Sequence, residues 1–336
     1  MKKYTVAVVG ATGAVGQTML RLLEERNFPV RTLVPLASSR SAGKKITFKN
    51  QTLTIKETLP EAFDGVDLAL FSAGTDVSRH LAPEATKLGA VVVDNSNAFR
   101  MDPNVPLVVP EVNPQAAANH RGLIANPNCS TIQLLVVLKP LHDRAKVKRV
   151  VVSTYQAVSG TGLEAIEELY QQSQELLSGK GVQPSVYPYQ IAFNVLPHID
   201  VFDHTGYSLE EWKMVRETKK VLDPEIEVTA TTVRVPVAYG HSESVNIETL
   251  QKLSPEEVRE ILTLAPGISV VDEPARLQYP LPIFAAGRDE VFVGRIREDF
   301  SLPHGINLWI VADNVRKGAA LNAVQIAELL IRDGLL

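Results

Sequence analysis

Cysteine is almost absent from this sequence, since Cys129 is the only one in 336 residues. A single thiol excludes an intramolecular disulfide, and with it the small secreted domains that depend on a disulfide framework. The seven histidines show no metal-ligand spacing with Cys129 or with each other, so we expect no metal site. The thiol is therefore either a buried packing residue, as free cysteines commonly are, or a reactive group.

Long apolar runs and a strong charge imbalance are also missing. No run approaches the roughly 18 residues that a membrane span needs. The net charge is −4 and the basic clusters are short, so we expect neither nucleic acid nor a membrane as partner. The apolar segment behind Lys2 and Lys3 stops at Gly10, which is too short for an export signal. We expect a cytoplasmic protein, long enough for two domains.

A glycine-rich turn follows the first predicted strand. Residues 4–9 are rich in β-branched side chains, Gly10, Gly13 and Gly16 come next, and apolar residues at helical spacing follow. Strand, glycine turn and helix form the context in which backbone amides hold a pyrophosphate. The spacing G-x-x-G-x-x-G differs from the usual G-x-G-x-x-G, so a tight turn with packing glycines is the alternative. The pattern predicts a dinucleotide site.

Further strands alternate with a helix in this part of the chain. Residues 66–71 and 91–93 read as strands, and residues 78–88 read as a helix near Pro83. This alternation predicts a parallel sheet that binds ligands at the carboxyl ends of its strands. Arg100 comes shortly after one such end, although a lone arginine is commonly a surface charge.

The segment after the strand predicted at residues 30–36 contains no acid. An NAD site usually has an acidic side chain there, for the ribose 2′-hydroxyl. Residues 38–43 instead provide hydroxyls and a guanidinium, including Arg40 and Ser41. Arg40 suits a 2′-phosphate by charge and geometry. A polar loop is the alternative, but NADP is the better prediction.

Cys129 stands at the predicted start of a helix. Pro127 and Asn128 read as a turn, and apolar residues at helical spacing follow Thr131. Exposed amides and the positive end of the helix dipole stabilise a thiolate in this position. The thiol is therefore a candidate nucleophile.

The middle of the chain supplies possible partners for that thiol. Gln156 follows a buried-type strand at residues 149–155 and opens a turn. Arg234 lies in a strand predicted at residues 233–237, and His241 follows in the next turn. Arginine in an apolar strand needs an anionic partner, and histidine is the natural proton carrier near neutral pH.

Glu210 and Lys213 lie on a predicted helix that runs to residue 221. Their spacing of i and i+3 puts them on one face, where a surface ion pair is the simple interpretation.

Taken together, these segments resemble the aspartate-β-semialdehyde dehydrogenases, and bacterial forms in particular, over essentially the whole chain. The most specific match is 126–131, supported by 94–100, 110–113, 156–162 and the pair Arg234 and His241. The resemblance implies that Cys129 is the nucleophile, that His241 is the acid–base residue and that Gln156 orients the acyl intermediate. It also implies substrate contacts from Arg100, Asn128, Gln156, Glu210, Lys213 and Arg234, and cofactor contacts from Gly10, Thr12, Gly13, Ala14, Val15, Arg40, Ser41, Ser159, Gly160 and Asn314.

The implied reaction is the NADPH-dependent reduction of 4-phospho-L-aspartate to L-aspartate 4-semialdehyde with release of phosphate. This step leads toward lysine, methionine and threonine. The implied fold is α/β, with a Rossmann-like NADP-binding domain of mainly parallel sheet (residues 1–127 and 315–336) and an α+β catalytic and dimerisation domain (128–314). A homodimer follows from the same resemblance.

Two alternatives stay open at this point. A related acyl-phosphate reductase, such as N-acetyl-γ-glutamyl-phosphate reductase, shares the two-domain plan and a Cys/His pair. A non-catalytic NADPH-binding paralogue is the other, although it leaves the combination of Cys129, Gln156, Arg234 and His241 unexplained. The apolar run near the C-terminus predicts a buried helix to about Arg332, without saying where it packs.

Overall fold

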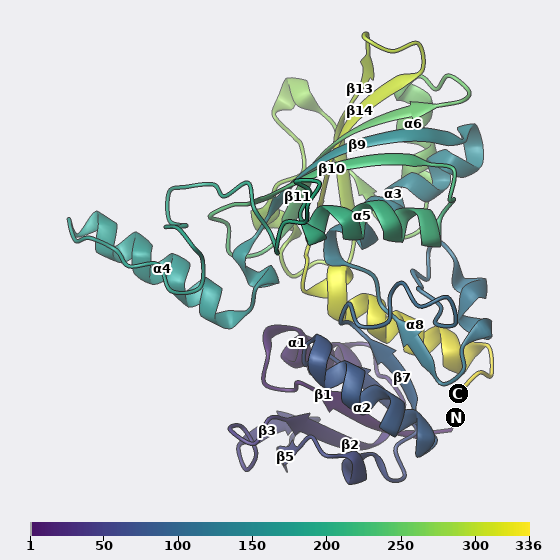
Figure 1. The fold of residues 1–336 in the computed structure, drawn as a ribbon. Helices are drawn as coiled ribbons and strands as arrows, with labels where there is room; N and C mark the ends of the chain where they lie inside the picture. Colours follow the sequence, from purple (N-terminus) through teal and green to yellow (C-terminus); the bar gives the residue numbers. More distant parts are fainter. Residues whose placement is uncertain (1) are drawn as a thin grey trace. The chain divides into compact units, whose positions relative to one another are not determined.

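A computed structural model describes residues 2–336, which form two compact units (Figure 1). The first unit runs to Asn128 and includes Ala319–Leu336, and the second is Cys129–Gly318. The sequence placed these boundaries after residues 127 and 314.

The first unit contains a parallel sheet in the order β5-β2-β1-β6-β7-β8. Its central strand β1 (Tyr4–Val9) is buried along its whole length, as expected for a parallel strand covered on both faces. The Rossmann-like prediction is therefore confirmed. The other strands are β2 (Val30–Ala37), β5 (Lys56–Glu57), β6 (Leu68–Phe71), β7 (Val91–Asp94) and β8 (Leu123–Ala125), and β3 (Lys45–Phe48) and β4 (Gln51–Thr54) form a separate hairpin.

Three helices accompany this sheet: α1 (Ala14–Glu25), α2 (Thr75–Lys87) and α8 (Leu321–Arg332). Helix α2 contains Pro83, close to the helix predicted there. Helix α8 is buried on most sides and packs with α1 in one core cluster, together with Val6, Val8 and Leu70. The predicted C-terminal helix is confirmed, and its apolar surface belongs to the core of the first unit.

The second unit contains a mixed sheet in the order β10-β9-β11-β14-β13-β12. Strands β10 and β9 pair in parallel, as do β12 and β13, whereas the pairs β9–β11, β11–β14 and β14–β13 are antiparallel. The α+β prediction for this region is confirmed. The strands are β9 (Val147–Gln156), β10 (Glu227–Arg234), β11 (His241–Thr249), β12 (Ile268–Val270), β13 (Val291–Asp299) and β14 (Gly305–Ala312).

Helices α3 (Cys129–Ala145), α5 (Leu209–Val221) and α6 (Pro255–Leu264) pack on this sheet, with α3 between the other two (Figure 1). Figure 1 also shows α4 (Leu163–Leu177) standing away from the sheet. Ile166 and Leu169 of α4 bury against the loop that carries Ile191. Tyr170 and Leu177 stay exposed on the same helix.

One predicted strand has different bounds. The sequence indicated a strand at residues 233–237 with His241 in its turn, but β10 ends at Arg234 and His241 is the first residue of β11. Pro236 has no backbone N–H to give to a strand neighbour, so the ladder stops before it.

Within residues 2–336, no helix is both long and apolar enough to cross a membrane.

The glycine turn before α1 depends on close backbone packing. Gly10 has φ +84°, and a Cβ on Gly16 would lie 2.1 Å from the Gly10 carbonyl oxygen. A Cβ on Gly13 would find its nearest atom at 3.5 Å, an ordinary contact. Gly16 is therefore required by space, whereas Gly13 is not.

We expect Gly16→Ala to lower the free energy of unfolding by about 1–3 kcal/mol, because the added methyl group must displace the Gly10 backbone. Gly13→Ala is the matched control and should cost less, at most about 1 kcal/mol, since only the preference for glycine at the helix N-cap is lost. Urea denaturation of both variants checks this. Equal stability of the two variants would contradict the close packing.

Candidate functional site

Three neighbouring strands of the second unit carry polar side chains at the same edge of the sheet, where β9 and β10 end and β11 begins. Arg234 is the last residue of β10 and pairs directly with Gln156, the last residue of β9. On the other side of β9, Ser242 pairs with Tyr155, which puts His241 beside Gln156. Residues opposite each other on paired strands share a face, so the three side chains form one row across the sheet. We call Arg234, Gln156 and His241 the front row.

His241 is completely buried and its ring orientation is fixed by the backbone. The amide N–H of Ala157 donates to His241 Nδ1 at 3.0 Å. A nitrogen that accepts carries no proton, so neutral His241 holds its proton on Nε2. Among residues 2–336, no group pairs with Nε2. The site thus contains a ring N–H donor that its own residues do not use.

The surroundings of His241 keep it neutral. Burial and the nearby Arg234 guanidinium lower the pKa of His241 to about 3, against the smaller opposing effect of Glu210. A Cβ on Gly160 would lie 3.0 Å from Arg234 Nη1 and 3.3 Å from His241 Nε2. A glycine at position 160 therefore keeps space open next to both functional groups.

Arg234 is buried at 5% exposure and only partly satisfied by the protein. Its Nη1 donates to the Ala157 carbonyl at 2.7 Å. The guanidinium carbon lies over the aromatic ring of Tyr187, 6.0 Å from the ring centroid. Arg234 Nε has no partner among residues 2–336. A buried guanidinium with donors to spare is suited to bind an anion, and a carboxylate matches its fork.

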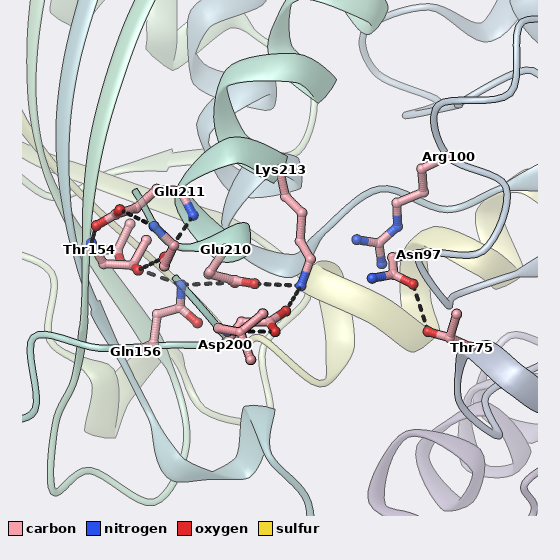
Figure 2. A network of polar contacts seen from close by, with 12 residues as sticks. Thr75, Asn97, Arg100, Thr154, Gln156, Asp200, Glu210, Glu211 and Lys213 are labelled. Atoms are coloured by element: carbon pink, nitrogen blue, oxygen red, sulfur yellow. Dashed lines mark hydrogen bonds and ion pairs between the residues drawn. The ribbon is translucent and has the colours of Figure 1, made fainter. Parts of the chain in front are cut away.

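A chain of polar contacts continues from Gln156 to two acids and a lysine (Figure 2). Gln156 Nε2 donates to Glu210 Oε1 at 3.1 Å, and Lys213 Nζ lies 3.0 Å from Glu210 Oε2 and 2.9 Å from Asp200 Oδ2. Burial alone would lower the pKa of Lys213, but Glu210 and Asp200 outweigh it and raise that pKa. Lys213 therefore stays charged, and Glu210, at 4% exposure, stays compensated.

The first turn of helix α5, which carries Glu210 and Lys213, is anchored by hydrogen bonds. Ser208 caps its first turn, accepting from the Glu211 amide at 3.2 Å, and Glu211 Oε2 accepts from the Ser208 amide at 2.8 Å. The other oxygen of Glu211 accepts from the Thr232 amide of β10 at 3.1 Å. This capping box fastens the start of α5 to the strand that carries Arg234.

Cys129 is the first residue of α3, as the sequence indicated. It is partly exposed, and a Cβ on Gly318 would lie 2.9 Å from the Cys129 Cβ, so a glycine packs directly against it. One turn later on α3, Gln133 Nε2 lies 3.4 Å from the backbone carbonyl of His241. The start of α3 is therefore next to the start of β11. Asn128 is buried and belongs to the first unit.

Ser159 and Asn314 are joined to each other. Asn314 Nδ2 donates to Ser159 Oγ at 2.9 Å, and Asn314 Oδ1 accepts from the Gly240 amide at 2.9 Å. Both side chains are buried, next to the residue that precedes His241.

In the first unit, five of the predicted cofactor residues lie at the turn between β1 and α1: Gly10, Thr12, Gly13, Ala14 and Val15. Helix α1 begins after Gly13, which provides no side-chain cap, so its first amides face the turn without one. A cavity of about 510 Å³ opens beside Ala11 and Thr12. Arg21, Lys44 and Lys45 also line it, with Glu24 as the acid.

Arg40 and Ser41 lie in the tight turn that follows β2 and do not line this cavity. The turn closes through the Ser41 amide on the Ser38 carbonyl at 2.9 Å. Arg40 is exposed.

Arg100 is more constrained than a surface arginine. It is 8% exposed, its Nε donates to the Asn126 carbonyl at 2.9 Å and one Nη to the Asn95 carbonyl at 2.7 Å. Its charge is thus held by the loops at the carboxyl ends of the first sheet. Figure 2 also shows Asn97, which bonds Thr75 at 2.6 Å.

Sequence reasoning missed several residues of the second unit. Asp200, which bonds Lys213, lies in a proline-containing loop and gave no local signal. Tyr187 bonds Thr161 at 2.9 Å, and burial raises the pKa of its hydroxyl. Glu243 lies two residues after His241 on β11, and only its complete burial distinguishes it. Among residues 2–336, no cluster of three or more His, Cys, Asp or Glu side chains could hold a metal ion.

Comparison with known proteins gives two family matches. Residues 5–120 match the semialdehyde dehydrogenase NAD binding domain, and residues 138–317 match the semialdehyde dehydrogenase dimerisation domain. An aspartate-semialdehyde dehydrogenase of Aquifex aeolicus is 58% identical and covers 99% of both chains.

Solved structures agree with these matches. The aspartate semialdehyde dehydrogenase II of Vibrio cholerae, complexed with ASA, is 50% identical with a TM-score of 0.96 over 99% of both chains. The Candida albicans aspartate semialdehyde dehydrogenase with NADP is 28% identical with a TM-score of 0.79 over 100% of both. This chain therefore belongs to the aspartate-semialdehyde dehydrogenase family.

Proposed function

We propose that this protein reduces 4-phospho-L-aspartate to L-aspartate 4-semialdehyde with NADPH, reversibly, through a thioester on Cys129. The observation that carries the proposal is the front row with Glu210 and Lys213 beside it. These groups present a cation for a carboxylate, an anion for an ammonium group and a cation for a phosphate.

Each charge of the substrate has a proposed partner. Arg234, whose buried Nε finds no partner among residues 2–336, binds the α-carboxylate. Glu210 binds the ammonium group, which competes for this carboxylate with Lys213, already 3.0 Å away. Lys213 and Arg100 bind the phosphate, and Asn128 adds a polar contact beside the nucleophile.

The chain's own residues account for the acyl chemistry. The Cys129 thiolate attacks the acyl phosphate, so that a C–S bond forms, the C–O bond to phosphate breaks and phosphate leaves. Gln156 orients the acyl oxygen of the thioester. NADPH, when bound, supplies the hydride that reduces this thioester. The Nε2–H of His241 donates a hydrogen bond to the former acyl oxygen, which becomes negative as the hydride is added. This tetrahedral intermediate then expels the Cys129 thiolate and releases the aldehyde.

The residues present fit a dinucleotide. Uncapped amides at α1 suit the pyrophosphate, and Gly10 and Gly16 have no Cβ that would fill the turn. The proposed contacts there are Gly10, Thr12, Gly13, Ala14 and Val15. Arg40 and Ser41 take the 2′-phosphate, which favours NADP over NAD. Ser159, Gly160 and Asn314 complete the proposed set near His241.

The assembly and setting follow from the same assignment. Residues 129–318 carry catalysis and form a homodimer, for which the exposed side chains Tyr170, Leu177, Tyr189 and Phe193 supply apolar surface. The protein acts in the cytoplasm, in the synthesis of lysine, methionine and threonine.

Turnover in the reverse direction tests the proposed function. The protein with L-aspartate 4-semialdehyde, phosphate and NADP⁺ should form NADPH, followed by its absorbance, and NAD⁺ should be the poorer cofactor. Cys129→Ser should lower kcat by at least about 10³-fold, because its hydroxyl is far less nucleophilic than a thiolate. It should leave NADP⁺ affinity unchanged.

Two outcomes would contradict this proposal. One is turnover with the N-acetylglutamate semialdehyde analogue but not with aspartate semialdehyde. The other is near-wild-type activity of Cys129→Ser.

The neutral state of His241 predicts a pH dependence of stability. The folded protein keeps His241 unprotonated down to about pH 3, whereas the unfolded chain binds a proton near pH 6.5. The contribution of neutral His241 to the free energy of unfolding is therefore fully present above pH 6.5. It is lost as the pH falls toward 3, by up to roughly 1.4 kcal/mol per pH unit from this one group.

His241→Asn, which cannot titrate, should show a shallower loss of unfolding free energy between pH 6.5 and pH 4 than the wild type. Denaturant titrations at a series of pH values measure the difference. Parallel curves for the two proteins would show that His241 is not held neutral.

A further inference from the structure

A second row of buried polar side chains lies directly behind the front row. Thr232 of β10, Thr154 of β9 and Glu243 of β11 stand two residues further along the same three strands. Because side chains alternate along a strand, these three share a face with the front row. Thr232 is 1% exposed, and Thr154 and Glu243 are 0% exposed. Glu243 is the only ionisable group of this row.

Within residues 2–336, Glu243 has no charged partner. Its neighbours across the sheet are Thr154 on β9 and Ile310 on β14, and the polar side chain that acts on it from α3 is Gln133. The contact between Gln133 and Glu243 is poorly aligned. Among residues 2–336, no group forms a hydrogen bond of good geometry with either carboxyl oxygen of Glu243 or with Gln133 Oε1. Burial without an opposite charge strongly disfavours a carboxylate. The pKa of Glu243 is accordingly raised well above its ordinary value.

Gln133 can form hydrogen bonds with both the His241 carbonyl and Glu243 only when Glu243 is protonated. Its Nε2 lies 3.4 Å from the His241 backbone carbonyl. A protonated Glu243 has one O–H to donate, and Gln133 Oε1 is an acceptor to which no group of residues 2–336 donates. A carboxylate at position 243 would instead attract Gln133 Nε2 and draw it away from the His241 carbonyl. Neutral Glu243 and the His241 contact therefore support each other.

We infer that Glu243, as a neutral carboxylic acid, is a positioning residue that orients Gln133 and through it fixes the start of β11 against the helix that carries Cys129. This inference rests on the proposed function of Cys129 and His241. Gln133 is on α3 one turn after Cys129, and it contacts the backbone of His241 itself. A shift of this contact moves the His241 ring relative to the reacting thiol, and displacements of about 1 Å can cost roughly 10²-fold in rate.

The test compares two substitutions of Glu243 in the full-length protein. Glu243→Gln keeps the shape and a donor but cannot ionise, so kcat should stay within about threefold of the wild type. Glu243→Leu removes the donor, so kcat should fall by about 10- to 100-fold. KM should change little, since Arg234, Glu210 and Lys213 remain. Glu248→Gln, a partly exposed acid on the same strand that pairs with Lys148, is the matched control.

A second measurement needs no substrate. The rate at which iodoacetamide alkylates Cys129 should be the same in the wild type and Glu243→Gln, and severalfold lower in Glu243→Leu. If the wild type fails to turn over aspartate semialdehyde, the proposed function fails, while this comparison still decides the role of Glu243. Should Glu243→Leu not fold, Gln133→Leu carries the test and should show the same loss of kcat and of alkylation rate.

Three results would overturn the inference. The first is a loss in Glu243→Gln as large as that in Glu243→Leu, which would mean that an ionised carboxylate is required. The second is wild-type kcat and alkylation in Glu243→Leu or in Gln133→Leu. The third is additive losses in a protein that carries both Glu243→Leu and Gln133→Leu. Two residues that act as one unit should together lose no more than the larger of the two single losses.

Discussion

The alignment of three strand ends is the constraint on which the rest of the second unit depends. Strand β9 pairs in parallel with β10 and antiparallel with β11, so Arg234 and His241 reach Gln156 from opposite sides. The side-chain period of a strand is two residues, so a register slip of one residue would move either group to the opposite face. The backbone hydrogen bonds between these strands therefore determine whether Arg234, Gln156 and His241 lie side by side on one face of the sheet.

Buried charge is the second organising factor, and the site compensates it unevenly. Glu210 and Asp200 bind Lys213, whereas Arg234 Nε and His241 Nε2 have no hydrogen-bond partner in the described part of the chain, residues 2–336. Unsatisfied polar groups in a folded interior are costly and tend to occur where a ligand will satisfy them. The cost is tolerated because the same strands are anchored elsewhere, for example by the capping box that ties α5 to β10.

The sequence was most informative where the signal is local. Residues 4–9, the helix beginning at Cys129 and the buried C-terminal helix follow from periodicity and turn chemistry, and each is observed. The front row was not readable in the same way, because 156, 234 and 241 meet only through strand pairing. The resemblance to a family named these residues, but it did not indicate their shared level on the sheet.

The remaining gaps have specific physical reasons. Asp200 contacts Lys213 from an irregular loop with no periodic pattern. The strand predicted at residues 233–237 was too long because the apolar pattern continues past Pro236, while the hydrogen-bond ladder does not. Gln133 and Glu243 looked like unremarkable polar residues, and only their burial distinguishes them.

A covalent acyl group on Cys129 is the central claim, and it can be observed directly. The protein is mixed with aspartate semialdehyde and NADP⁺ while phosphate is omitted, quenched in acid and analysed by intact-mass and peptide mass spectrometry. Without phosphate to release it, the thioester should accumulate, giving one aspartyl adduct on the Cys129 peptide for each NADPH formed. NADPH formation with no adduct, or with an adduct on another residue, would contradict the mechanism.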